Sequence, residues 1–358
     1  MKNQHPLSDH KVLCLSLMFL SGELPSDVRR KLNHIFGQGK IAEDFRSLSA
    51  VGLIRKINED GLRGYTLTDE GLQFFADKCP GKYEFSRFYE ETSYQYEKST
   101  RIRRRQFARV LLAMYLNGVN IDDHSLEACR VLNGCPEEIT TPFFVPMNVL
   151  RQCHPRFFAV YGSLCYGAII SAQKVMLVYA PMDTDILYIS CEERLKKTLT
   201  GILQMAAPPY HLPDALEYIY YFQKDGDIVH SFSPEGKSNN RTSNMLRWYE
   251  VNRLTKSHII SDLHRLRLTD NPLIIPADQD CLYYTFRYMS PSVLMTAIQH
   301  ARSEDYDHSE KILLQCFEEE EELLNRILSE SFSDVKDCFR INVISKSNME
   351  RIDCDDKV

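Results

Sequence analysis

The residues of this sequence with the clearest potential for chemistry are acids that could hold a metal ion. A metal-dependent nuclease needs an aspartate on one strand and, on the next, an acidic residue two positions before a lysine. The nearest match consists of Asp183 or Asp185 followed by Glu192, Glu193 and Lys196. The spacing from acid to lysine is wrong, and Ser190-Cys191-Glu192-Glu193 has the spacing of a helix capping box. We therefore expect no nuclease centre here.

Other catalytic and metal-binding patterns are also missing. The sequence has no H-E-x-x-H, no G-x-x-x-x-G-K-[ST] and no G-x-S-x-G. His258 and His264 are six positions apart on a predicted helix, so they do not align as a metal pair. The glutamates Glu318 to Glu322 radiate from a predicted helix and cannot converge on one ion, which favours a solvated helix face. We predict that the protein is not an enzyme and uses no metal or cofactor.

Composition sets broad limits on the class of protein. A chain of 358 residues can form two or three domains with substantial cores. The 11 cysteines include no C-x-x-C pair, which is typical of reduced, buried thiols. The net charge of −6 argues against wholesale binding to a polyanion but permits a local basic surface. No apolar run approaches the roughly 18 residues of a membrane span, so we expect a cytoplasmic protein without membrane contact.

The first 50 residues predict three helices. Ser8 can cap the first, and Gly22 ends it. Ser26 or Asp27 can cap the second, which ends at Gly37. The third begins near Gly39 and has one inward face at i, i+4 and i+7, formed by Ile41, Phe45 and Leu48.

A small hairpin and a fourth helix follow. Gly52 suits the left-handed residue that ends a helix, residues 53–57 predict a strand, and residues 65–67 predict its partner. Residues 58–64 form a flexible tip whose glycines can adopt positive φ, and Thr68 can cap the next helix. This order predicts a winged helix-turn-helix over residues 1–80. The phrase GLIRK…GYTLTDEG resembles the strand–wing–strand–helix segment of many bacterial winged-helix proteins.

A winged helix implies that the third helix enters the major groove of DNA. We expect base-edge contacts from Arg46 and Ser47, a phosphate contact from Lys40, and backbone contacts from the wing residues Arg55, Lys56 and Arg63. Glu43 and Asp44 lie on the same helix and would repel phosphate. An alternative therefore stays open, in which the winged helix makes protein contacts.

The next segment is rich in aromatic residues and acids, and then in arginine. Residues 80–98 predict a packing connector, and Ser99 or Thr100 can cap a helix that ends at Gly118. This helix carries a run of basic residues: Arg101, Arg103, Arg104, Arg105 and Arg109. Two interpretations are equally open. The first four of these arginines could extend the DNA-binding surface, or the run could pair with the acids of residues 84–97.

The remainder predicts one mixed α/β domain with a central sheet. Its expected strands cover residues 163–171, 174–180, 216–223, 227–233, 273–277, 281–289 and 339–345. Its expected helices cover 190–203, 244–266, a segment from Ser290-Pro291, and a long amphipathic helix over 310–332. The predicted class is α+β multidomain: a winged helix over 1–80, a helical connector over 81–139, the α/β domain over 140–347, and a polar tail over 348–358.

A winged helix followed by an arginine-rich helix and an α/β domain resembles the replication-relaxation and mobilisation-associated proteins of bacterial plasmids and integrative elements. The resemblance implies a bacterial DNA-binding protein that regulates transcription or assists replication or mobilisation of a mobile element. Double-stranded DNA is the expected partner, with a protein partner or a homodimer also open. The alternative function is a protein–protein interaction or scaffold role.

Overall fold

The structure is a computed structural model. It describes residues 7–37, 39–78, 98–135, 138–182, 188–206, 208–212, 215–233, 245, 248–249, 256–262, 266, 283–285, 289–307 and 311–345. Several predictions fall outside these residues: the acidic connector over 80–97, Asp183 and Asp185, His264, the strand over 273–277, and the tail over 348–358.

The helices and hairpin predicted for the first 78 residues are present. The helices are α1 (Asp9–Ser21), α2 (Ser26–Phe36), α3 (Lys40–Ala50) and α4 (Asp69–Lys78). Strands β2 (Ile54–Glu59) and β3 (Leu62–Leu67) form the antiparallel hairpin. The sequence did not predict β1 (Leu24–Pro25), which pairs with β3 and completes a sheet of order β1-β3-β2.

Turn and cap residues fix the hairpin between α3 and α4. The predicted tip over 58–64 is shorter than expected: Glu59 pairs with Leu62, and only Asp60 and Gly61 turn the chain, at φ of 53° and 75°. Positive φ at both positions matches the right-handed twist of the strands. Thr68 caps α4 as predicted, since its Oγ1 accepts a hydrogen bond from the Gly71 amide at 3.0 Å.

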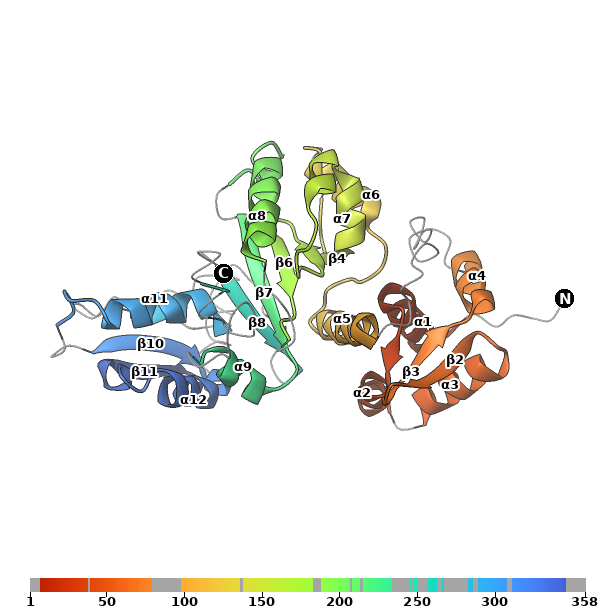
Figure 1. Ribbon diagram of the computed structural model, residues 1–358, viewed down its shortest axis with the longest axis horizontal. Coiled ribbons are helices and arrows are strands. Elements are labelled where there is room, and N and C mark those ends of the chain that lie inside the picture. Colours follow the sequence, from red (N-terminus) through yellow and green to blue (C-terminus); the bar gives the residue numbers. More distant parts are fainter. Residues whose placement is uncertain are drawn as a thin grey trace, which may run out of the picture.

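A five-stranded sheet forms the centre of the molecule (Figure 1). Its order is β4 (Phe143–Pro146), β5 (Gly167–Ile170), β6 (Val175–Tyr179), β7 (Leu216–Phe222) and β8 (Ser257–Ser261). The first three strands are antiparallel, and β6, β7 and β8 run parallel. Around it lie α6 (Ser125–Leu132), α7 (Met147–Cys153), the 3-10 helix η2 (Pro155–Ala159), α8 (Ile189–Leu203) and α9 (Asp225–Ser231).

We expected a single central sheet in this half of the chain, but the structure has a second one, which is parallel and three-stranded. It consists of β9 (Tyr283–Thr285), β10 (Ile312–Phe317) and β11 (Phe339–Ile344) in the order β11-β10-β9. Helices α11 (Pro291–Ala301) and α12 (Glu321–Ser331) connect its strands, with the 3-10 helices η5 (Glu318–Glu320) and η6 (Lys336–Cys338).

Three predictions in this half are wrong. Residues 227–233 were expected to be a strand but fall largely in α9, and the helix expected over 244–266 contains β8. The long helix expected over 310–332 is β10 followed by α12. In each case a short apolar run fits either a buried strand or one side of a helix, and periodicity alone does not separate them.

The glutamate run was also misread in part. Glu320 is only 3% exposed, and its carboxylate accepts hydrogen bonds from the backbone amides of Phe317 and Met289, both at 2.8 Å. One member of the run is therefore a buried structural group, whereas Glu318 and Glu319 are exposed.

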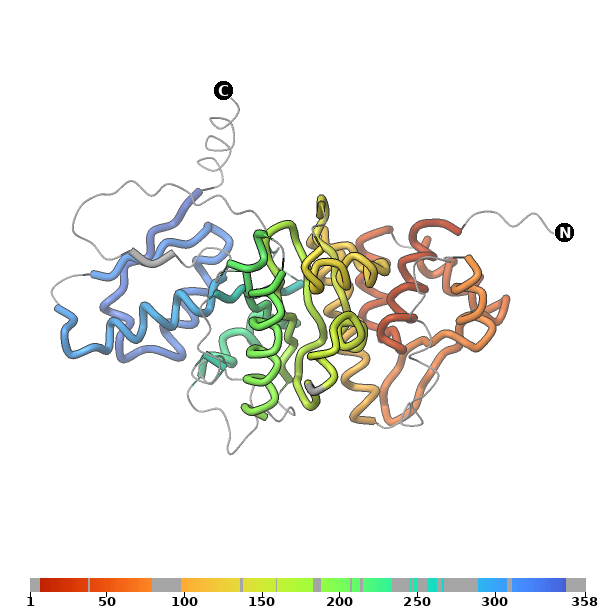
Figure 2. The backbone as a smooth tube through the Cα atoms, turned by 90° about the horizontal axis from the view of Figure 1, so that it is seen from above, coloured from red at the N-terminus to blue at the C-terminus, as the bar shows by residue number. Residues whose placement is uncertain are grey.

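Helix α5 (Lys98–Leu116) lies between the N-terminal elements and the five-stranded sheet (Figure 1). It packs on α1, and its apolar residues share one core with alternate residues of the sheet, among them Val178, Ile219 and Tyr221. The other alternate residues, such as Leu177 and Tyr220, enter a second core beneath α7 and α8. The chain progresses along the long axis of the molecule from one end to the other (Figure 2).

No helix in the described part of the chain is long and apolar enough to cross a membrane.

Candidate nucleic-acid interface

Helix α3 separates an apolar side from a polar side, as its sequence predicts. Ile41, Phe45 and Leu48 are at most 3% exposed and enter the N-terminal core. The residues that we expect to contact DNA lie on the solvent side: Lys40, Arg46 and Ser47 are all exposed. The helix therefore exposes the expected residues to solvent.

The two acids of α3 have different surroundings. Asp44 is partly buried, and its carboxylate lies 3.6 Å from the ammonium group of Lys11 on α1. Its charge is therefore compensated within the protein. Glu43 is exposed and lies on the surface of the helix beside the basic residues.

An arginine on α2 holds α3 and the hairpin together. The guanidinium of Arg29 lies 5.8 Å from the ring centre of Phe45 and 5.4 Å from that of Tyr65. Its Nη1 donates a hydrogen bond to the Tyr65 hydroxyl at 2.8 Å. Cation–π contacts and this bond join α2, α3 and β3, which fixes the angle between helix and hairpin.

The strand register shows which hairpin residues face α3. Tyr65 packs against Phe45 of α3, with ring centres 4.7 Å apart, and Lys56 pairs directly with Tyr65. Because residues two apart on a strand share a face, Arg63 lies on the same side as Tyr65. Lys56 and Arg63 therefore extend the basic surface of α3.

Arg55 lies on the opposite face of the hairpin. It lines a small cavity of about 110 Å³ together with Glu23, Arg101 and Arg104. Alternation along β2 makes this separation unavoidable, since neighbouring residues point to opposite faces. Lys56 is thus placed beside α3, and Arg55 beside α5.

The structure gives two arginines of α5 a structural role in place of the expected DNA contact. Arg101 and Arg105 are 1% and 8% exposed, and both bind the buried carboxylate of Glu23. The distances are 2.8 Å from Arg101 Nε to Glu23 Oε2 and 2.7 Å from Arg105 Nη1 to Glu23 Oε1. Buried guanidinium groups cannot reach a phosphate, so the expected DNA contact from these two residues does not fit the structure.

The same arginines hold the hairpin in place. Arg101 donates hydrogen bonds to the backbone oxygens of Glu59 and Leu62, at 2.9 and 3.3 Å, and Arg105 donates to that of Arg63 at 2.9 Å. The hydrogen bond to Glu23 raises the pKa of Arg101 above its ordinary value, against the opposing effect of burial. Helix α5 thus positions the hairpin through its buried arginines.

The remaining arginines of α5 lie on other sides of the helix. Arg103 is exposed, but its guanidinium lies over the Tyr166 ring at 5.5 Å and donates to the Ser163 carbonyl at 3.3 Å. Arg104 lies against Gly22, and Arg109 binds Asp27 of α2 at 2.8 Å. Glu23 and Asp27 are thus two acids that pair with this helix, and the acids of residues 84–97 lie outside the described residues.

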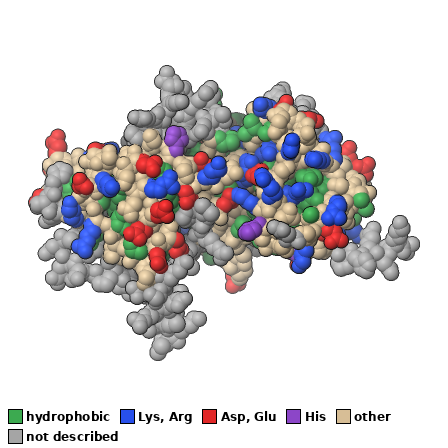
Figure 3. Space-filling model, turned by 90° about the horizontal axis from the view of Figure 1, so that it is seen from below, with side chains coloured by type: hydrophobic (Ala, Val, Ile, Leu, Met, Phe, Trp, Pro, Cys, Tyr) green, Lys and Arg blue, Asp and Glu red, His purple; other side chains and the backbone are tan. Residues whose placement is uncertain are grey.

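Basic side chains gather on one surface of the molecule. Viewed from below, many Lys and Arg side chains lie over the half of the molecule that holds the N-terminal elements, with some acidic side chains among them (Figure 3). Sequence reasoning missed the supporting residues Glu23, Arg29 and Lys11, because each acts on a residue that is distant in the sequence.

The acids considered for a nuclease are not brought together as a metal site in the described part of the chain. Glu192 is 2% exposed, and its carboxylate accepts hydrogen bonds from the hydroxyls of Ser163 and Tyr179, at 2.8 and 2.9 Å. Burial raises the pKa of Glu192, although these hydrogen bonds act to lower it. Among the described residues, no group of three or more His, Cys, Asp or Glu could hold a metal ion.

Comparisons with family models, curated proteins and solved structures find no match to this chain.

Proposed function

We propose that residues 9–78 form a winged helix that binds double-stranded DNA, with α3 in the major groove and the α3 side of the hairpin along the phosphate backbone. An α-helix fits the major groove of DNA, and basic side chains on the hairpin can contact the phosphates beside it. The protein would act as a DNA-binding regulator or accessory factor.

The observation that supports this proposal is that both α3 and the adjoining face of the hairpin expose basic residues. Lys40 and Arg46 are exposed on α3. Lys56 and Arg63 are exposed on the hairpin, and the register of β2 with β3 supports a position on the side that faces α3. Asp44 is compensated by Lys11. Phosphate contacts by lysine and arginine supply most of the affinity of such a surface.

Glu43 fits this proposal as a base-reading residue. A carboxylate in the major groove can accept a hydrogen bond from the amino group of cytosine, whereas it repels phosphate. We therefore expect Glu43 to select cytosine-containing sites. Replacement by Gln should strengthen binding to unselected DNA and weaken the preference among selected sites.

The test is selection from fragmented genomic DNA at about 50 mM salt, followed by fluorescence anisotropy over a series of salt concentrations. Each of Arg46→Ala and Lys56→Ala should weaken binding, and loss of a phosphate contact should reduce the salt slope by about one. The neighbouring substitution Arg55→Ala is the matched control, because Arg55 lies on the other face of the hairpin. It should leave affinity and slope unchanged.

Two results would reject the proposal. The first is the absence of any duplex binding at about 50 mM salt, where phosphate contacts are strongest. The second is an equal loss for Arg55→Ala and Lys56→Ala. A co-purifying protein that survives nuclease treatment and high salt would instead favour the protein-interaction function, to which the exposed acids Glu43, Glu59 and Asp60 are suited.

A further inference from the structure

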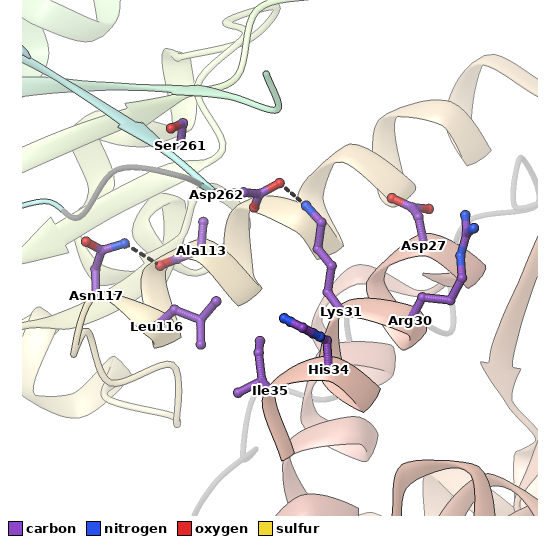
Figure 4. A pocket seen from close by; sticks show the side chains of 10 residues that line it. All are labelled: Asp27, Arg30, Lys31, His34, Ile35, Ala113, Leu116, Asn117, Ser261 and Asp262. Atoms are coloured by element: carbon purple, nitrogen blue, oxygen red, sulfur yellow. Dashed lines mark hydrogen bonds and ion pairs between the residues drawn. The ribbon is translucent and has the colours of Figure 1, made fainter. Parts of the chain in front are cut away.

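A cleft separates α2 from the end of α5 and the end of β8 (Figure 4). Its volume of about 620 Å³ lies within the roughly 300–1,000 Å³ typical of small-molecule sites. Its walls come from three separate elements: α2, α5, and Ser261 with Asp262 at the end of β8. The carboxyl ends of parallel strands are a common location for ligand sites in α/β proteins.

One part of the cleft is apolar. Ile35 and Leu116 approach each other from α2 and α5, with Ala113 one turn away on α5 (Figure 4). Ile35 is 43% exposed and Leu116 is 37% exposed, whereas Ala113 is buried. This wall can cover the hydrocarbon part of a ligand, which gains free energy from the area removed from water.

The acids of the cleft are already compensated. Asp27 accepts hydrogen bonds from Arg109 Nε and Nη2 at 2.8 and 3.2 Å, and Asp262 binds the Lys31 ammonium. Asp262 also accepts a hydrogen bond from the Tyr221 hydroxyl at 3.3 Å. Neither carboxylate is available to attract a cationic ligand.

Two other polar residues of the cleft have no such partner. Arg30 and His34 form no hydrogen bond or ion pair with the rest of the described chain. Both come from α2, on successive turns, and both are exposed. The uncompensated charge of the cleft is therefore positive, beside an apolar wall.

We propose that this cleft binds a small molecule with an anionic head group and an apolar body. The anion would bind at His34, and Arg30, whose side chain lies beside Asp27 in Figure 4, would reach it from the preceding turn of α2 by a change of rotamer. The apolar body would lie between Ile35 and Leu116. Arginine and histidine provide several donors that match a carboxylate, sulfonate or phosphate, and charge-assisted hydrogen bonds are the stronger kind. No residue that lines the cleft is among those proposed to contact DNA, so the two proposals depend on different residues.

The test uses three probes that share one apolar body: phenylbutyrate, phenylbutanol and phenylbutylamine. Binding to the full-length protein is measured by isothermal titration calorimetry near pH 7. We expect phenylbutyrate to bind most tightly and phenylbutylamine most weakly. A charge-assisted hydrogen bond corresponds to about a tenfold difference between the anion and the neutral alcohol.

Substitutions of residues that line the cleft test whether the probes bind there. Arg30→Gln and His34→Gln should each lower the affinity for phenylbutyrate, by about tenfold for Arg30→Gln, without changing that for phenylbutanol. Leu116→Gln should weaken the binding of all three probes. Arg46→Gln replaces an exposed arginine outside the cleft and should change none of them.

Three outcomes would overturn the proposal. They are the binding of no probe at millimolar concentration, equal affinity for the anion and the cation, and unchanged phenylbutyrate binding in both Arg30→Gln and His34→Gln. Thermal unfolding of each variant shows whether it is folded. Since Arg30, His34 and Leu116 are all exposed, we expect the variants to unfold near the wild-type temperature.

Discussion

At the scale of single residues, Glu23 connects α5 to the hairpin. Its carboxylate is 2% exposed and compensates two buried arginines, which in turn bind the hairpin backbone. Removing one member of a buried charge group leaves the others without a partner, at a cost of about 3–5 kcal/mol. The position of the hairpin therefore depends on this one acid.

We predict that Glu23→Gln lowers the free energy of unfolding by about 3 kcal/mol, measured by urea denaturation. Glu43→Gln is the control, because Glu43 is exposed and should change stability by less than about 0.5 kcal/mol. Equal stability of the two variants would show that the buried group around Glu23 does not hold the hairpin.

A second buried acid makes stability depend on pH. Glu217 is 1% exposed, and its carboxylate lies 2.8 Å from His258 Nε2, 2.9 Å from Lys256 Nζ and 3.2 Å from Lys174 Nζ. Burial alone would raise its pKa. The hydrogen bond and charge of His258, with the two lysines, outweigh burial and lower the pKa of Glu217 to about 2.

Because the folded-state pKa of Glu217 lies below the value of about 4.5 for a free glutamate, the ionised form stabilises the fold. This contribution is complete above pH 4.5 and is lost as the pH falls towards 2. We predict that stability falls over this interval in the wild type and that Glu217→Gln flattens the fall, as measured by urea denaturation at each pH. An unchanged pH dependence in the variant would contradict this assignment.

At the scale of elements, the hairpin is determined by its turn. Gly61 has a φ of 75°, and no atom lies within 4 Å of where a Cβ would be placed. A side chain at this position would therefore meet no steric clash, but holding a non-glycine residue at positive φ would cost about 1 kcal/mol. Gly64 differs, since its added Cβ would lie 2.7 Å from Glu23 Oε1 and 2.9 Å from the Leu24 carbonyl oxygen.

We predict that Gly61→Ala destabilises the protein by about 1 kcal/mol and that Gly64→Ala destabilises it more, because the second change also displaces buried groups. Gly226→Ala is the matched control: Gly226 lies in α9 with open space around it and no positive φ. It should be neutral or slightly stabilising in thermal unfolding. A larger loss for Gly226→Ala than for Gly61→Ala would contradict the role of the turn.

At the scale of the whole molecule, α5 joins two parts of the chain in one core. Apolar residues of α1, of α5 and of one sheet face belong to the same cluster, which includes Leu17, Leu111 and Ile219. The contacts of Lys31 with Asp262 and of Asn117 with the Leu266 amide cross the same boundary. We therefore expect that a loss of packing among the N-terminal helices also destabilises the five-stranded sheet.

The only tryptophan allows this to be measured. Trp248 is fully buried in the other core, against Tyr179 and Tyr220 on the far face of the sheet. We predict that Leu17→Ala lowers the midpoint of the Trp248 fluorescence transition as much as that of the circular-dichroism transition, since one cooperative unit unfolds. A Trp248 transition that stays at the wild-type temperature would show independent unfolding.

Local sequence patterns were enough to predict the helices and the hairpin of the first 78 residues. Stop glycines, a capping threonine and the i, i+4, i+7 spacing of Ile41, Phe45 and Leu48 depend on neighbours within a few residues, so the helices and hairpin could be predicted. The exposure of Lys40, Arg46, Lys56 and Arg63 follows from the same local patterns.

The contacts of the α5 arginines and the limits of the strands in the C-terminal half depend on tertiary contacts and could not be predicted from local patterns. Arg101 and Arg105 bind Glu23 across 78 and 82 positions. Strand β7 pairs with β8 across 39 positions, as at Tyr221 and Ile260. A charge run has the same appearance whether it meets phosphate or a buried carboxylate, and a short apolar run is the same in a strand or a helix. What separates these cases is contact between distant residues, which depends on the packing of the whole chain.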